Sequence, residues 1–446
     1  MRRALLLIAV AFLAGCSSGD GTTGVDPESL SGGATTVFES SSNAYRLPAP
    51  NLGGASLARH REGDVAFDRT FITAPASPFG GLGPLFNDTS CSGCHVNNGR
   101  GSSSVLVRVS RGGIADDGGP IPVAGYGLQV QDRAVLGRRR EAVVTETDEV
   151  LTGSYPDGKS YTLQRRRFVL GELYQPIDGP IATSPRIPPP VFGLGLLEAI
   201  PAGDILAGAD EFDRDGDGIS GRPNFVTDAA TSFPVLGRFG WKANQPTLRQ
   251  QTAAAYNGDM GITTTLFPEE NSHGQASQLD SLSDDPELAE SVVDITTFYV
   301  QSLGVPARRD LDDPEVRRGL ALFNQIGCAS CHQSEFRTGS TAAVSELAGQ
   351  TIHPYTDLLL HDMGEELADD RIDYLASGRE WRTAPLWGIG LLRTVNGLPR
   401  LLHDGRASTL EEAILWHGGE AAAVRDRFTS LPVSDRRALI RFVSSL

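Results

Sequence analysis

The sequence predicts a mainly α fold built from two similar units in tandem, with a β-rich insertion in the first unit. The pattern L-F-N-x-x-x-C-x-x-C-H occurs twice at identical spacing, at residues 85–95 and 322–332, and indicates an internal repeat. Apolar residues recur at helical spacing before the second copy and towards the end of each unit. A stretch of the first unit instead alternates between apolar and polar residues, which is typical of strands.

The composition limits the possible classes of protein. The chain has 446 residues, of which 40% are hydrophobic, and its formal net charge is −16. The apolar content excludes a wholly disordered chain, and the length allows several domains of roughly 100–200 residues each. The acidity argues against binding to nucleic acids or to anionic membranes without an anchor, because both require basic clusters. Beyond the N-terminus no apolar run approaches the roughly 20 residues of a membrane-spanning helix.

The N-terminus has the layout of a secretory signal. Arg2 and Arg3 precede an apolar run, residues 4–14, that is too short to span a membrane. The run ends in L-A-G followed by Cys16, which resembles the bacterial lipobox, where cleavage precedes a lipidated cysteine. The alternative is an ordinary signal with a chance cysteine. Ser17 follows instead of Asp, which in such lipoproteins favours the outer membrane.

This pattern predicts a signal peptide at residues 1–15 and a periplasm-facing lipoprotein anchored through Cys16. Residues 16–44 are predicted to form a flexible tether, because the segment after Cys16 is rich in Ser, Gly and Thr. Cleavage removes Arg2 and Arg3 and so changes the formal net charge from −16 to −18. We therefore expect a basic or neutral redox partner.

Each copy of the repeat contains C-x-x-C-H, the pattern of haem c attachment. The first copy comprises Cys91, Cys94 and His95, and the second comprises Cys328, Cys331 and His332. Two thiols at this spacing can form thioethers with the two vinyl groups of one haem, and the histidine then faces the iron. A zinc site made from both cysteine pairs, or two redox disulfides, are the alternatives, but neither requires a histidine after each pair. The sequence thus predicts two covalently attached haems, called haem one and haem two in chain order.

Helices are predicted around both motifs. Pro286 can open a helix whose apolar residues continue to Leu303, and Asp313-Pro314 can open another before the second motif. Ser434 or Asp435 can cap a helix that closes the chain. The resulting domains are a cytochrome c-like unit at residues 45–305 and a second one at residues 306–446.

The first unit is the longer one, and its excess is predicted to be β structure. Strands are expected at residues 105–110, 126–131, 142–151 and 161–170, with a Tyr155-Pro156-Asp157-Gly158 turn between the last two.

An acidic loop follows these strands. Asp213, Asp215 and Asp217 fit the pattern D-x-D-x-D-G, in which oxygen ligands surround a glycine turn as in calcium sites. The twelfth position is Asn224 instead of the Glu of an EF-hand, so the loop is either a partial calcium site or a solvated acidic turn.

Sixth ligands for the two irons are sought among methionines and histidines. Met363 lies 31 residues after His332 and is the favoured ligand of haem two, with His361 as its rival and a buried core residue as the alternative. Met260 is a weaker candidate for either haem. No histidine lies between His95 and His273, so haem one is expected to have an open or exchangeable position.

Other residues are candidates for supporting roles. Glu198 is flanked by apolar residues and could act as an acid–base group beside a haem, or simply be a salt-bridged core residue. Electron relays or core packing are the two interpretations for Trp241, Trp381, Trp387 and Trp416. His403 and His417 could bind propionates or close a haem pocket, and His417 also suits a structural role.

Long segments of the chain closely resemble the bacterial di-haem oxidoreductases described as peroxidases or thiol oxidoreductases. The segments are residues 81–101, 216–224, 239–243, 351–365, 379–386 and 401–421. The resemblance extends from about residue 45 to the end. The part that begins at His403 is more distantly similar to the C-terminal segment of bacterial cytochrome c peroxidases. The resemblance to the di-haem oxidoreductases implies two haems in pseudo-repeated domains, one transferring electrons and the other reacting with peroxide.

The expected function is therefore that of a peroxidase-like di-haem enzyme. Electrons from a periplasmic donor would enter at haem two and reduce hydrogen peroxide or another small oxidant at haem one. The first alternative is a di-haem electron-transfer lipoprotein without a substrate, and the second is a structural or iron-sensing lipoprotein. Thiol chemistry is not expected, because every cysteine already has a lipid or haem to bind.

Overall fold

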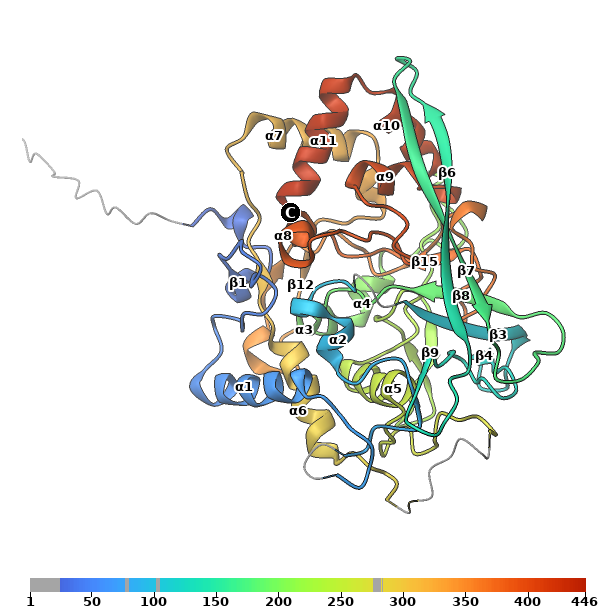
Figure 1. Ribbon diagram of the computed structural model, residues 1–446. Helices are drawn as coiled ribbons and strands as arrows, with labels where there is room; N and C mark the ends of the chain where they lie inside the picture. Colours follow the sequence, from blue (N-terminus) through green and yellow to red (C-terminus); the bar gives the residue numbers. More distant parts are fainter. Residues whose placement is uncertain (1–24, 77–79, 102–104, 276–281, 283) are drawn as a thin grey trace, which may run out of the picture.

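The computed structural model describes residues 25–76, 80–101, 105–275, 282 and 284–446 (Figure 1). The α-helices are α1 (Gly54–Asp68), α2 (Cys91–Cys94), α3 (Leu194–Glu198), α4 (Ala202–Leu206), α5 (Leu248–Met260), α6 (Glu290–Ser302), α7 (Pro314–Gln325), α8 (Leu392–Asn396), α9 (Leu410–Leu415), α10 (Ala422–Ser430) and α11 (Val433–Ser445). Short 3-10 helices are η1 (Pro27–Ser29), η2 (Gly33–Thr35), η3 (Val96–Asn98), η4 (Cys328–Ser330), η5 (Ser345–Leu347), η6 (Glu365–Leu367), η7 (Ile389–Leu391) and η8 (Gly419–Ala421).

The strands form several small sheets. They are β1 (Thr36–Val37), β2 (Leu85–Phe86), β3 (Leu106–Ile114), β4 (Pro120–Ile121), β5 (Arg133–Ala134), β6 (Val143–Ser154), β7 (Ser160–Gly171), β8 (Ala182–Arg186), β9 (Phe225–Thr227), β10 (Pro234–Leu236), β11 (Val305–Pro306), β12 (Phe336–Arg337), β13 (Thr351–Ile352), β14 (Leu360–Asp362) and β15 (Glu380–Arg382). The largest is the three-stranded sheet β4-β3-β8, and the others are pairs.

The expectation of a mainly α fold is wrong, because the protein is 30% helix and 19% strand. Most of the strands are only two or three residues long and pair across loops, and such short pairs leave no periodic pattern in a sequence. The long strands were expected at 105–110, 142–151 and 161–170, and β3, β6 and β7 lie there. The expected strand at 126–131 is replaced by irregular chain with isolated bridges such as Arg108 to Gln129.

Two helix crossings repeat in the two halves of the chain. Helix α1 packs against α6, and α7 packs against α11. A glycine occupies each crossing: a Cβ added at Gly63 would lie 2.7 Å from the Cβ of Tyr299, and one at Gly319 would lie 2.5 Å from that of Phe442. Both distances are too short for a side chain, so glycine permits the close approach of the helices.

Helices α6, α7 and α11 of these crossings are predicted from the sequence, but the predicted start is correct only for α7. Helix α7 begins at Pro314 with Asp313 as its N-cap, as the sequence predicts. Helix α6 begins at Glu290, later than the expected start at Pro286. The last helix begins at Val433 after Pro432, so neither Ser434 nor Asp435 is its cap.

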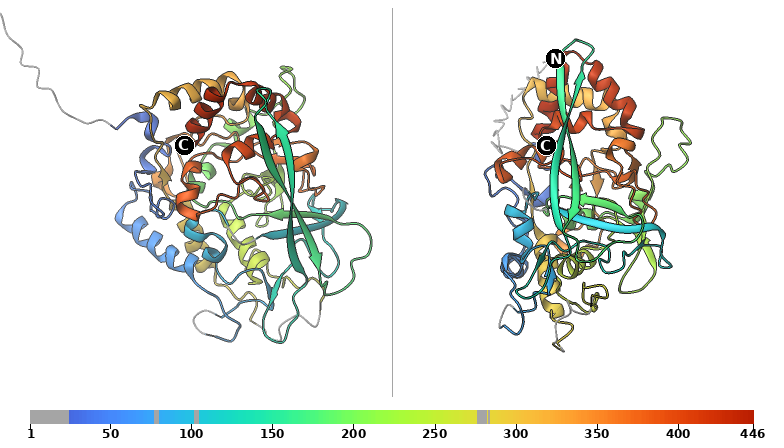
Figure 2. Two further views of the ribbon diagram at one scale, coloured as in Figure 1. Left: turned by 45° about the horizontal axis from the view of Figure 1, so that its top comes forward. Right: turned by 45° about the vertical axis from the view of Figure 1, so that its right-hand side comes forward.

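The hairpin β6–β7 connects the two halves. Its strands pair in continuous register from Val143 and Gly171 to Ser154 and Ser160, around the predicted turn. The hairpin runs along one side of the molecule, and its tip reaches α10 (Figures 1 and 2). There the Tyr155 hydroxyl donates to Glu411 at 2.7 Å. The insertion in the first half is thus fastened to the second half.

The expected tether is wrong for the segment that the structure describes. Strand β1 pairs with β11, and the side chains of Ser31, Thr35 and Ala44 are buried. A composition rich in Ser, Gly and Thr suits tight turns as well as flexible linkers, which explains the error. The predicted signal peptide and Cys16 lie outside the described residues. Among the described helices, none combines the length and the apolar character needed to cross a membrane.

One hydrophobic core is shared by both halves. Its largest cluster contains Tyr45, Phe67 and Tyr299 from the first half and Trp387 and Trp416 from the second. A second cluster around Phe323 and Phe442 also includes Tyr155 from the hairpin.

Candidate functional site: two C-x-x-C-H motifs in one cavity

The first motif forms a single helical turn. The Ser90 hydroxyl accepts a hydrogen bond from the Gly93 amide at 3.0 Å and caps α2. The His95 amide donates to the Cys91 carbonyl at 2.9 Å, which completes the turn and places His95 directly after the two cysteines. The imidazole Nδ1 of His95 lies 2.8 Å from the carbonyl oxygen of Pro189. Because a carbonyl only accepts, Nδ1 carries the proton and Nε2 keeps a free lone pair.

The second motif has the same arrangement. The His332 amide donates to the Cys328 carbonyl at 3.0 Å, and Nδ1 of His332 donates to the carbonyl of Tyr355 at 2.9 Å. The ring centroids of Phe323 and His332 are 6.3 Å apart, which matches the 6.2 Å between Phe67 and His95. Both histidines are therefore oriented by a carbonyl and an aromatic ring.

Both histidines are neutral near pH 7. Burial lowers the pKa of His95 and of His332 to about 4, against the opposing effect of the carbonyl bonds. A neutral imidazole with a free Nε2 is the form that binds iron. Burial also raises the pKa of Cys91 and of Cys328 to about 12, so these thiols are poor nucleophiles.

The motifs open into one cavity of about 420 Å³. The cysteines and histidines of both motifs line it, together with mostly apolar side chains. Within the described part of the chain, the only group of three or more candidate metal ligands whose atoms converge is the aspartate loop, so the four cysteines do not form a zinc site. A wide apolar cavity with two thiol pairs and two oriented imidazoles fits haem groups.

Helix α5 forms the wall near the first motif. One of its faces lines the cavity with Leu248, Thr252 and Asp259, and Met260 at its end also lines it. Burial raises the pKa of Asp259, whose Oδ1 accepts a hydrogen bond from Gln129 at 2.9 Å. Met260 thus lines the cavity. Its role as the weaker candidate for an iron ligand stays a prediction.

Near the second motif the cavity wall contains His361, Met363 and His417. His361 is held on both sides: Nε2 lies 2.8 Å from Asp357 and Nδ1 lies 3.0 Å from Glu420. Both ring nitrogens of His361 are thus engaged by carboxylates, which favours Met363 and His417 over His361 as ligand candidates. Met363 and His417 remain as candidates.

Glu198, the candidate acid–base group, does not lie beside the two motifs. It is not part of the cavity wall. Its Oε1 accepts from the Leu248 amide at 2.7 Å, and its Oε2 accepts from the Gln301 side chain at 2.6 Å. The carboxylate therefore joins α3 to the start of α5 and to α6, and the structure gives it no contact with the cavity.

Three of the four tryptophans line the cavity, namely Trp241, Trp381 and Trp387, whereas Trp416 does not. Trp381 stacks on His403 with ring centroids 3.7 Å apart. Burial lowers the pKa of His403 to about 4.

Five arginines of the cavity wall were not predicted from the sequence. They are Arg100, Arg108, Arg186, Arg382 and Arg425. The Arg108 side chain forms neither a hydrogen bond nor an ion pair with any described residue, although its charge interacts with that of Asp259. Burial lowers its pKa to about 10, which leaves it charged at neutral pH. An unpaired buried cation requires an anionic partner, and haem carboxylates would supply one. No sequence signal distinguishes these arginines from surface ones.

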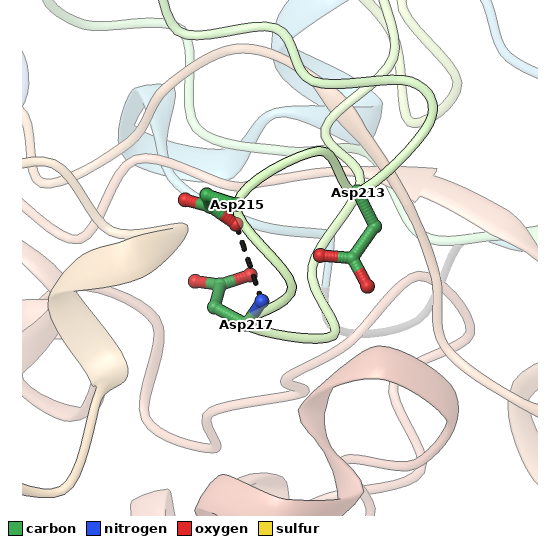
Figure 3. A group of neighbouring side chains, drawn as sticks. All are labelled: Asp213, Asp215 and Asp217. Carbon is green, nitrogen blue, oxygen red and sulfur yellow. Dashed lines mark hydrogen bonds between the residues drawn. The ribbon is translucent and has the colours of Figure 1, made fainter.

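The acidic loop gathers its three aspartates (Figure 3). One carboxylate oxygen of each lies within 4.8 Å of the others. The side chain of Asn224 instead donates to the carbonyls of Lys242 and Asp373, so the twelfth position takes no part in the loop. Next to the loop, the Ser220 hydroxyl donates to Glu420 at 2.6 Å, and Glu420 contacts His361 near the second motif.

Comparisons with known proteins agree with this site. The family described as "Di-haem oxidoreductase, putative peroxidase" matches residues 25–112 and 115–446, so the chain belongs to this family of di-haem oxidoreductases. The family implies haem cofactors and a redox function for the chain. No curated protein matches the sequence significantly. A structure of Kuenenia stuttgartiensis hydrazine synthase under xenon pressure is 13% identical over 99% of this chain and 100% of that chain. Its TM-score of 0.37 is too low to support an argument.

Proposed function

We propose that the protein is a c-type di-haem oxidoreductase with peroxidase-like activity. Haem one would be attached to Cys91 and Cys94 and ligated by His95, and haem two would be attached and ligated by the second motif. The observation that carries this proposal is that both motifs present a neutral imidazole, with Nε2 free, to the same cavity. When bound, the haems supply one-electron redox chemistry and a site for a small oxidant.

The chain itself would bind and orient these groups. The Pro189 and Tyr355 carbonyls hold the two imidazoles in the tautomer that iron requires. Arg108 would bind a propionate of haem one, because its guanidinium lines the cavity without a hydrogen bond or ion pair to any described residue. The apolar lining excludes water and so strengthens these interactions.

Haem one is proposed as the reactive haem. Met260, which belongs to the hydrophobic cluster that packs against Cys91, is the methionine of the described wall beside the first motif. Haem two, with Met363 and His417 nearby, would be six-coordinate and pass electrons from the donor. Hydrogen peroxide or another small oxidant would be reduced at haem one.

We also propose that the loop of Asp213, Asp215 and Asp217 binds Ca²⁺ in a structural role. Three converging carboxylates support this proposal. Calcium titration by calorimetry should show one binding event that is absent when Asp215 and Asp217 are replaced by Asn.

The proposed setting is the periplasmic side of the outer membrane, with Cys16 as the lipid anchor and a basic or neutral periplasmic donor as partner. Support comes from the lipobox-like sequence and the charge of the chain. Labelling with a radioactive fatty acid should be lost in a Cys16→Ala variant.

The haem assignment is tested on protein produced with the periplasmic haem attachment machinery. We expect two covalent haems per chain, one of them high-spin or exchangeable, and turnover of hydrogen peroxide with a reduced donor. The paired variants C91A/C94A and C328A/C331A should each lose one haem. Two haems that both stay low-spin after reduction, without peroxide turnover, would contradict the enzyme and favour an electron carrier.

A further inference from the structure

His417 has the chemical state of an iron ligand. It follows α9, and its Nδ1 lies 2.7 Å from the carbonyl oxygen of Ala413, one helical turn earlier. The carbonyl only accepts, so Nδ1 carries the proton and the lone pair is on Nε2. No described residue forms a hydrogen bond with Nε2. This is the same arrangement that the carbonyls of Pro189 and Tyr355 impose on His95 and His332.

The position of His417 points to haem two. Its imidazole lines the cavity that contains His332, together with Ala413 and Ile414 from the same helix. Ile414 packs against the hydrophobic cluster of Phe323, whose ring faces His332. The two histidines are close enough that His417, after the larger effect of burial, contributes to the lowered pKa of His332.

Met363 is less well placed for the same role. It packs against the large shared core and not against the cluster that contains Phe323 and Tyr355, the two residues that orient His332. Its backbone is fixed by a hydrogen bond from its amide to the Arg379 carbonyl at 3.0 Å, and Gly418 lies beside its carbonyl. Met363 therefore lies alongside the segment that contains His417, on the side of that segment that faces the shared core.

We propose that His417, and not Met363, is the sixth iron ligand of haem two, which makes this a bis-histidine site. The inference rests on the proposed attachment of haem two to the second motif. Coordination through Nε2 forms one bond to the metal and needs no change in protonation, because His417 is already neutral: burial lowers its pKa. A bis-histidine site has a lower reduction potential than a His/Met site, since a thioether raises the potential.

The test compares the wild-type holoprotein with His417→Ala and Met363→Leu by visible absorption and electron paramagnetic resonance. Both variants should keep two covalent haems. H417A should convert one low-spin haem per chain into a high-spin one, and added imidazole should restore the low-spin signal. M363L should keep the wild-type spectrum. Wild-type protein with imidazole shows how much of the effect arises at haem one.

Two further measurements separate ligation from packing. A His417→Met variant should gain a sulfur-to-iron charge-transfer band and a higher potential of haem two. The proposal is overturned if H417A leaves the low-spin signal intact, or if M363L rather than H417A produces the high-spin haem. Failure of the underlying attachment has a different signature, because the C328A/C331A variant would then keep both haems.

Discussion

At the scale of single residues, Arg108 is a cation of the cavity wall whose guanidinium forms no hydrogen bond or ion pair with a described residue. It lies on β3 in the cavity wall, close enough to Asp259 for the two charges to interact. A buried positive charge stabilises the reduced, more negative state of a nearby haem. We therefore predict that Arg108→Gln lowers the potential of haem one, whereas Arg108→Lys retains part of the effect.

Spectroelectrochemical titration measures this change. Arg317→Gln is the matched control, because Arg317 is exposed, is paired with Asp312 and is not part of the cavity wall. An unchanged potential of haem one in R108Q would show that Arg108 does not face that haem.

Glu141 gives a second prediction at this scale. Its carboxylate is fully buried and accepts hydrogen bonds from the Gln131 amide and the Gln275 side chain. Burial raises its pKa from 4.5 to about 8. Between these values the folded protein holds a proton that the unfolded chain has lost, so the free energy of unfolding falls as the pH rises through this range.

Replacing Glu141 by Gln should remove this dependence. The difference in free energy of unfolding between wild type and E141Q should change by a few kcal/mol between about pH 5 and pH 8. This is the order of magnitude to which the pKa shift of Glu141 corresponds. Denaturant unfolding at several pH values measures it. A constant difference between the two proteins over that range would contradict the raised pKa.

At the scale of elements, the hairpin tip is one of the contacts between the two halves, in addition to their shared core. Tyr155 is 3% exposed, lies in the cluster of Phe323 and Phe442, and has the guanidinium of Arg436 over its ring at 3.8 Å. Tyr155→Ala should lower the free energy of unfolding by about 3–5 kcal/mol, as for other buried aromatic residues. The spectrum of haem two should change before that of haem one during unfolding.

Tyr155→Phe is the matched control. It keeps the ring and removes the hydrogen bond from the hydroxyl to Glu411, so we expect a loss of about 1 kcal/mol. Equal losses in Y155A and Y155F would mean that the hydroxyl, and not the ring, fastens the hairpin.

The elements also show what could be predicted from the sequence. The hairpin was predictable because its alternation and its turn are local, and α7 was predictable because Asp313 and Pro314 are adjacent in the chain. The partners of the two motif histidines were not predictable. They are backbone carbonyls of Pro189 and Tyr355, and a carbonyl has no signature in a sequence. Only the folded chain brings such distant groups together.

At the scale of the whole molecule, the proposed electron route from haem two to haem one would run through the part of the chain where both halves share one core. Trp387 is well placed to assist electron transfer between the two haems. Its neighbour Leu386 donates its amide to Pro354, next to the Tyr355 that holds His332. Its ring lies against Gly193, where an added Cβ would be 2.7 Å from it, in the segment that follows Pro189. Trp387 thus connects the two histidine supports.

Charge distinguishes Trp387 from the other tryptophans. Cations lie over the rings of Trp241 (Arg100, 5.0 Å), Trp381 (Lys242, 4.6 Å) and Trp416 (Arg406, 4.7 Å). A cation over a ring stabilises its neutral form and makes removal of an electron more costly. Among the described contacts, no cation lies over Trp387.

We therefore predict that Trp387→Phe slows electron transfer from haem two to haem one, while Trp416→Phe, outside the cavity wall, leaves it unchanged. The two haems are reduced, one equivalent of peroxide is added, and the oxidation of haem two is followed by stopped-flow absorption. The rate in W387F should fall by about tenfold or more, which corresponds to an additional barrier of about 1.4 kcal/mol. A normal rate in W387F together with a slow rate in W381F would transfer the relay to Trp381 and its stacked partner His403.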